Sequence, residues 1–113
     1  MNLEQKFSTS IVIPVLNEEK SLEILCEEIN TSMSALINCS VYEIIFVDDG
    51  STDNSWQIEK KLATKYPKKV RAIRLKKNFG KATALNVGFK NSKNEIIITL
   101  DSDLQDDPKE IHK

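Results

Sequence analysis

Four short apolar runs constrain the fold of this chain more than any other feature of its sequence. They lie at residues 10–14, 41–47, 70–75 and 96–100. Most of them are apolar at nearly every position, whereas a strand with one wet face alternates apolar and polar residues. Such runs are typical of strands that are buried on both faces of a parallel sheet. None approaches the roughly 20 residues of a membrane-spanning helix.

The segments between these runs have helical spacing. After the first run, apolar residues recur every three or four positions, at Leu22, Leu25, Cys26, Ile29, Met33, Leu36 and Ile37. Asn17 is the expected N-cap of this helix. A turn at Gly50 and a second helix that ends before Pro67 follow the second run, and residues 82–89 are expected to form a third helix.

The alternation of strands and helices predicts a doubly wound α/β sheet. Strands joined through helices must run parallel, and right-handed crossovers place helices on both faces. Arg71 and Arg74 interrupt the run at 70–75, which indicates an edge or half-exposed strand. The run at 96–100 is expected to be buried inside the sheet, and a central last strand would leave an edge uncovered. We therefore expect residues 1–113 to be the N-terminal part of a longer protein, with a sheet that is incomplete at the C-terminus.

The composition fits a single soluble domain. The chain has 113 residues, of which 40% are apolar and 29% are charged, and its net charge of −1 gives no sign of nucleic-acid binding. Ten of its 16 Lys and Arg residues lie between Lys60 and Lys81, with no acid among them. Such a run indicates either a solvated face or a surface for phosphate or an anionic membrane.

The cysteines and the N-terminus favour a cytoplasmic protein. Cys26 and Cys39 have no metal-ligand spacing and are too few for a disulfide framework, so both are expected to be reduced. The first ten residues lack the apolar core of a secretory signal. We expect a location in the cytoplasm, including the cytoplasmic face of the membrane.

Polar oxygen ligands follow two of the apolar runs directly. Asp48 and Asp49 end the second run, and Asp101, Asp103 and Gln105 follow the last one. The carboxyl ends of parallel strands meet at the ligand-binding edge of an open sheet. Asp101 and Asp103 can share a hard cation such as Mg²⁺ or Mn²⁺, to which Gln105 adds a neutral oxygen. The alternative interpretation is a solvated acidic loop that caps a helix.

Four sequence blocks carry a resemblance to a known family. They lie at residues 13–18, 47–53, 78–81 and 100–106, in this order and with helical spacers between them. Together they resemble glycosyltransferase family 2, whose members are inverting enzymes with a GT-A fold. The last two blocks are most similar to the polyprenyl-phosphate branch, the dolichol-phosphate mannosyltransferase and bactoprenol glucosyltransferase type.

The resemblance implies that residues 1–113 form the nucleotide-sugar-binding part of a GT-A domain. The enzyme would move a sugar from a nucleoside diphosphate, with UDP expected over GDP, to a polyprenyl phosphate or a saccharide in cell wall or glycolipid synthesis. The residues implied in nucleotide binding are Pro14, Asn17, Glu18, Asp48, Asp49, Lys81, Asp101 and Ser102. The implied ligands of Mg²⁺ or Mn²⁺ are Asp101, Asp103 and Gln105.

The resemblance places the remaining catalytic machinery elsewhere. No residue of this chain is an obvious general base, and the family's base and acceptor motifs are expected beyond Lys113. A polyprenyl phosphate is already anionic and needs a base less than a sugar hydroxyl does. The chain departs from the family pattern at Leu16, where many relatives carry an aromatic residue, and at residues 107–109, where Pro-Pro-Glu is frequent.

Two other function classes are compatible with parts of the sequence. A non-catalytic nucleotide-binding or membrane-peripheral module would use the cations between Lys60 and Lys81. A phospho-accepting receiver domain also has a doubly wound sheet, but it needs an acid pair after its first strand, which here ends at Pro14. A homo-oligomer, and membrane attachment through segments beyond Lys113, are also compatible with the sequence.

Overall fold

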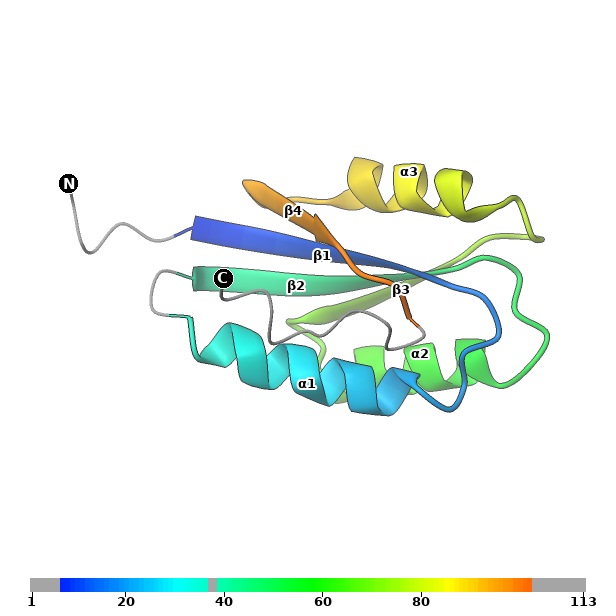
Figure 1. Cartoon of the computed structure of the whole chain (residues 1–113), viewed down its shortest axis with the longest axis horizontal. Coiled ribbons are helices and arrows are strands. Elements are labelled where there is room, and N and C mark those ends of the chain that lie inside the picture. Colours follow the sequence, from blue (N-terminus) through cyan, green and yellow to red (C-terminus); the bar gives the residue numbers. More distant parts are fainter. Residues whose placement is uncertain (1–6, 37–38, 103–113) are drawn as a thin grey trace.

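The computed structural model describes residues 7–36 and 39–102. Strands and helices alternate along the chain as the sequence predicts (Figure 1). The elements are β1 (Phe7–Val15), α1 (Leu22–Ser34), β2 (Cys39–Asp48), α2 (Ser55–Lys65), β3 (Val70–Arg74), α3 (Lys81–Asn91) and β4 (Ile96–Thr99). Among these residues, no helix is both long and apolar enough to cross a membrane.

The strands form one parallel sheet with the order β3-β2-β1-β4 in the described part of the chain. α1 and α2 cover one face of the sheet and α3 covers the other (Figure 1). The doubly wound α/β fold that the sequence predicts is therefore confirmed. β2 and β3 follow β1 on one side, whereas β4 lies on the other side of β1, so the strand order reverses between β1 and β4. Ligands of open α/β sheets bind at such a reversal of the strand order. A receiver domain is excluded. In a receiver domain the first strand lies between the second and the third, whereas here β1 lies between β2 and β4.

The two faces of the sheet explain the uninterrupted apolar run of β1. Ile11 and Ile13 pack with the side chains of α1, whereas Val12 packs with α3 on the opposite face. All three are fully buried. α3 approaches closely at Gly88, where a Cβ atom would lie 2.2 Å from a methyl carbon of Val12. Packing on both faces explains why these three positions are apolar, and the buried Ser10 before them donates its hydroxyl hydrogen bond to Glu43 of β2.

β4 differs from the sequence prediction. It lies at an edge of the sheet rather than inside it, and Ile96 and Ile97 are 40% and 44% exposed. The physical reason is that, in the part of the chain that is described, β4 pairs with β1 alone. β3 forms the opposite edge, which confirms the prediction made from Arg71 and Arg74.

Pro14 does not end the first strand, because β1 continues to Val15. The backbone carbonyl of Val12 accepts a hydrogen bond from the N–H of Leu100 on the β4 side. Pro14, two residues later, has the same orientation and faces the β4 side too. The β1–β4 ladder already ends at the pair of Val12 and Thr99, so the missing N–H of the proline removes no ladder bond.

Cys26 is buried on α1 and forms no disulfide. Its burial raises the pKa of the thiol to about 11, so the thiol stays protonated at neutral pH. Cys26 is therefore a structural residue, as the sequence predicts, whereas the side chain of Cys39 lies outside the described part.

Candidate functional site

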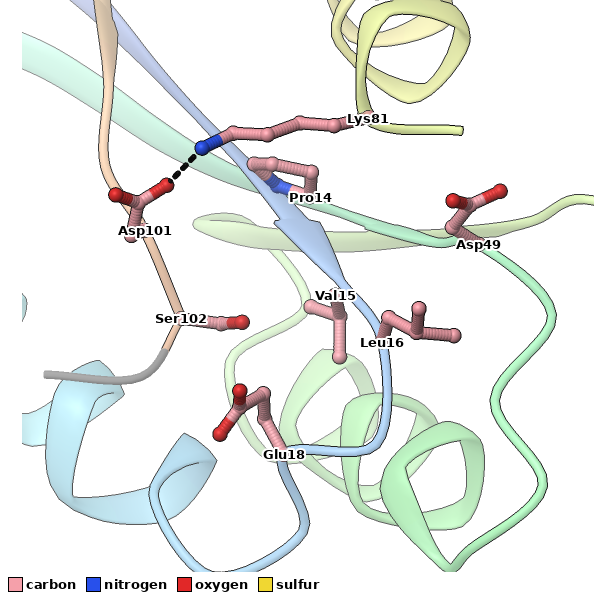
Figure 2. Close-up of a pocket in the computed structure, with 8 residues that line it drawn as sticks. All are labelled: Pro14, Val15, Leu16, Glu18, Asp49, Lys81, Asp101 and Ser102. Carbon is pink, nitrogen blue, oxygen red and sulfur yellow. Dashed lines mark hydrogen bonds and ion pairs between the residues drawn. The ribbon is translucent and has the colours of Figure 1, made fainter. Parts of the chain in front are cut away.

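A pocket of about 280 Å³ opens at the carboxyl ends of the strands. Its lining comes from β1 and the loop after it, the end of β2, the start of α3 and the segment after β4 (Figure 2). The lining residues are Pro14, Val15, Leu16, Glu18, Asp49, Lys81, Asp101 and Ser102. Six of the eight residues that the sequence implicates in nucleotide binding therefore surround one cavity, at the point where the strand order reverses.

Lys81 and Asp101 form an ion pair in the wall of the pocket. The ammonium nitrogen of Lys81 lies 2.5 Å from Oδ1 of Asp101, and the two side chains point toward one another in Figure 2. Lys81 is the first residue of α3, and Asp101 follows β4. The pair places a cation and a carboxylate, 20 residues apart in sequence, on the same wall of the pocket.

Asp49 holds the loop that precedes α3. Its carboxylate accepts hydrogen bonds from the backbone N–H groups of Phe79, at 2.8 Å, and of Gly80, at 3.1 Å. Asp49 is only 4% exposed, although it lines the pocket. The side chain thus connects the end of β2 to the start of α3.

Gly50 allows the same two loops to touch. Its φ angle is +77°, and a Cβ atom would lie 2.6 Å from the backbone nitrogen of Asn78. Both the left-handed conformation and the close approach require glycine. Gly80 also has a left-handed φ of +103°, but a Cβ atom there would meet nothing within 4 Å.

We expect Gly50→Ala to lower the free energy of unfolding by about 2–3 kcal/mol, from the strained φ and the backbone clash together. Gly80→Ala is the control without a clash, because a Cβ atom there meets nothing within 4 Å; its φ of +103° and ψ of 158° favour glycine, so the strain alone should cost about 1–3 kcal/mol. Urea unfolding followed by circular dichroism measures both values. A loss of no more than about 1 kcal/mol in Gly50→Ala, the cost of the left-handed φ alone, would contradict the close contact between the loops.

Asn17 does not cap α1, contrary to the sequence prediction. α1 begins at Leu22, and Ser21 is its N-cap residue. Asn17 has a left-handed φ of 54°, and its side-chain oxygen accepts hydrogen bonds from the backbone N–H groups of Thr52, at 2.8 Å, and Asp53, at 3.2 Å. It therefore joins the loop after β1 to the loop after β2, and it is not among the residues that line the pocket.

Asp48 is fully buried and also lies outside the pocket lining. One of its oxygens accepts a hydrogen bond from the N–H of Ser51, at 3.0 Å. The other oxygen and both oxygens of buried Glu59 have no donor in the described residues. Burial, together with the hydrogen bond and the charge of Asp48, raises the pKa of Glu59 to about 10. A proton on Glu59, shared with Asp48, would supply the donor that these buried oxygens lack, which agrees with a Glu59 that is protonated at neutral pH.

Ser21 is a residue of the site that the sequence did not reveal. Its hydroxyl donates a 2.5 Å hydrogen bond to the backbone carbonyl of Ser102, and both residues are buried. This bond ties the start of α1 to the segment that carries Asp101. A contact between residues 81 positions apart leaves no local sequence signal.

A family model described as glycosyl transferase family 2 matches residues 10–113. The chain belongs to glycosyltransferase family 2. Its curated relatives include the undecaprenyl-phosphate 4-deoxy-4-formamido-L-arabinose transferases of Yersinia enterocolitica, at 45% identity, and Photorhabdus laumondii, at 41% identity. The matches cover 90% and 98% of this chain but only 31% and 34% of these relatives. This family 2 chain therefore spans about a third of their length.

Solved structures of glycosyltransferases have the same fold. The mannosyltransferase PcManGT from Pyrobaculum calidifontis, in complex with GDP-Man and Mn²⁺, matches 87% of this chain and 28% of its own with a TM-score of 0.75 and 23% identity. S. aureus TarS in complex with UDP-GlcNAc matches 85% of this chain and 26% of its own with a TM-score of 0.70 and 27% identity. The GT-A fold expected from the sequence is confirmed.

The metal ligands expected for this family 2 chain lie only partly in the described structure. Asp101 lies on the pocket wall, while Asp103 and Gln105 are outside the described residues. Residues 7–36 and 39–102 hold no group of three or more His, Cys, Asp or Glu side chains that could bind a metal. Asp101 nevertheless fits the role, because its carboxylate reaches the pocket and already holds the ammonium group of Lys81 there.

Proposed function

We propose that this chain is the donor-binding part of an inverting glycosyltransferase that transfers a sugar from a nucleoside diphosphate to a polyprenyl phosphate, with a saccharide as the alternative acceptor. One observation carries this function: Asp49 after β2, Lys81 at the start of α3 and Asp101 after β4 converge on one pocket. The curated relatives are named as undecaprenyl-phosphate transferases, which supports the lipid acceptor. UDP is the expected nucleotide, and the cytoplasmic face of a membrane is the expected location.

The lining residues divide the pocket into parts with different chemistry. Pro14 and Leu16 offer apolar contact to a base, and Glu18 offers a carboxylate to a ribose hydroxyl or a base N–H. Lys81 stands at the first position of α3, where the helix dipole and the lysine both favour an anionic diphosphate. The nucleotide would thus place its base at the β1 loop and its phosphates between α3 and the segment after β4.

The leaving diphosphate is the group that the site must stabilise. Lys81 neutralises part of the charge that develops on it, and Asp101 holds Lys81 on the pocket side of α3. A divalent cation on Asp101, Asp103 and Gln105 would act as a Lewis acid on the same diphosphate. The phosphate of a polyprenyl acceptor is anionic at neutral pH, so the donor part of the site needs no general base of its own.

Calorimetric titration of UDP and GDP into the chain, with and without Mn²⁺, tests this function. We expect one of the two nucleotides to bind and its affinity to depend on Mn²⁺. Equal binding with and without the metal would refute the role of the cation. No binding by a chain that is folded by circular dichroism would refute the donor site.

A further inference from the structure

We infer that Asp49 is a positioning residue that sets Lys81 for the diphosphate of the donor, an assignment that rests on the proposed function because it requires a nucleoside diphosphate in this pocket. The resemblance to glycosyltransferase family 2 implies that Asp49, or its neighbour Asp48, accepts hydrogen bonds from the base or the ribose. Its hydrogen bonds in the structure point elsewhere. Asp49 uses its carboxylate on the two residues that come directly before Lys81.

The contacts of Asp49 fix the backbone at the start of α3. Oδ1 accepts from the N–H of Phe79 at 2.8 Å, and the N–H of Gly80 lies 3.1 Å from Oδ2 and 3.3 Å from Oδ1. Hydrogen bonds to a carboxylate are roughly twice as strong as bonds between neutral groups. Gly80 is the N-cap residue of α3, so these bonds fix the position of the backbone at which the helix begins.

The close approach of Gly50 to the backbone of Asn78 also restrains this loop, but Phe79 and Gly80 have few other contacts in the described structure. The side chain of Phe79 is half-exposed, and the space beside the Cα of Gly80 is open to at least 4 Å. The side chain of Asn78 adds one hydrogen bond to the N–H of Gly80, at 3.0 Å. The loop therefore depends on polar contacts, and Asp49 supplies the charged ones.

The loop before α3 sets the position of Lys81, and the side chain of Lys81 lines the pocket. A lysine side chain has several rotatable bonds, and holding it in one geometry costs rotamer entropy. Asp101 accepts the ammonium group at one end, and Gly80 sets the backbone at the other. A shift of about 1 Å in the backbone would move the ammonium group away from a bound phosphate, and such shifts lower reactivity strongly.

Asp49→Asn changes the hydrogen bonds of this side chain while keeping its size. The asparagine side chain has nearly the same shape but only one acceptor oxygen, and its NH₂ group would face a backbone N–H donor. Asp49→Asn should therefore release at least one of the two amides of Phe79 and Gly80. If Asp49 contacted only the base, its substitution would instead weaken the binding of every nucleotide equally, whatever the number of phosphates.

The test compares nucleoside diphosphates with monophosphates. We define the diphosphate preference as the Kd of UMP divided by the Kd of UDP, measured by calorimetry with Mn²⁺, or the same ratio for GMP and GDP if guanine nucleotides bind. Asp49→Asn should lower this preference about tenfold, and Lys81→Met should lower it at least as much. The double variant should lower it no further than Lys81→Met alone, because both changes act through the same ammonium group.

An unchanged preference in Asp49→Asn would overturn the assignment, because the residue would then act on the base or ribose alone. Gly80→Ala is the second variant, since it disturbs the loop and leaves the carboxylate of Asp49 in place. If Asp49→Asn fails to fold, the diphosphate preference of Gly80→Ala is the test. A lower preference than in the unchanged chain supports the assignment, and an equal preference refutes it. Absence of any nucleotide binding in the unchanged chain would instead refute the proposed function.

Discussion

Asp101→Asn is expected to remove the Mn²⁺-dependent part of nucleotide binding, with a loss of about 100-fold or more in affinity. Asparagine preserves the volume of the side chain but removes the charge that attracts a divalent cation. The same change removes the anionic partner of Lys81. Lys81 then loses an anchor, but the phosphates also lose a neighbouring carboxylate that repels them, so the affinity measured without metal should change much less than the affinity measured with Mn²⁺. Calorimetry with and without Mn²⁺ measures both effects in one pair of titrations.

A matched control separates the local effect from the loss of one negative charge. Glu23 is an exposed acid in the first turn of α1 and is not among the residues that line the pocket. Glu23→Gln changes the net charge of the chain by the same amount and should leave the Mn²⁺ dependence unchanged. If Asp101→Asn keeps the full enhancement by Mn²⁺, the cation is bound elsewhere and the proposed metal role of Asp101 is wrong.

The order of the elements could be predicted from the sequence because local patterns determine it. Residues that are buried on both faces of the sheet make the runs of β1 and β2 apolar at nearly every position, and the segments between the strands keep helical spacing. The position of β4 could not be predicted in the same way. Its apolar sequence is that of a buried strand, but burial depends on which strands pair with it, and β1 is its one partner in the described structure.

The roles of Asp48 and Asp49 show what the sequence contains and what it does not. Phe46 packs on the α1 face of β2 and Val47 packs on the α3 face. The two-residue period of a strand sends Asp48 to the first face, beside Glu59 of α2, and Asp49 to the second, beside the loop before α3. The pleat thus explains why two adjacent acids have different roles. The partners themselves depend on how distant loops meet, which no local pattern reveals.

Glu59 is expected to make the chain less stable as the pH rises. Its pKa is about 10 in the folded chain, against about 4.5 when unfolded. Between these values the folded chain binds one proton more than the unfolded chain, so the free energy of unfolding falls by about 1.4 kcal/mol per pH unit. The stabilising contribution is complete below the unfolded pKa and is lost as the pH rises through the folded pKa. From about pH 5.5 to about pH 8.5 the loss amounts to roughly 4 kcal/mol.

Glu59→Gln isolates this effect, because its amide can still donate a hydrogen bond to Asp48 but cannot ionise. Urea unfolding at several pH values should give a steeper fall in stability for the unchanged chain than for the variant. Glu43 does not interfere. Burial raises its pKa, but hydrogen bonds from Ser10 and from the N–H of Lys93, with the charge of Arg71, outweigh burial and lower the pKa overall. The contribution of Glu43 to the free energy of unfolding is therefore lost only at acidic pH, below the pKa that Glu43 has in the unfolded chain.

Parallel pH profiles for the chain and for Glu59→Gln would show that Glu59 is ionised in the folded state, and the shared proton would be refuted. A steeper fall in the unchanged chain would have a consequence for the site as well. Asp48 accepts the N–H of Ser51, whose hydroxyl in turn accepts the N–H of Asn17 in the loop beside the pocket. Ionisation of Glu59 would place two negative charges beneath this loop. Nucleotide affinity should then fall at the same alkaline pH at which the fold loosens, and it should do so less in Glu59→Gln.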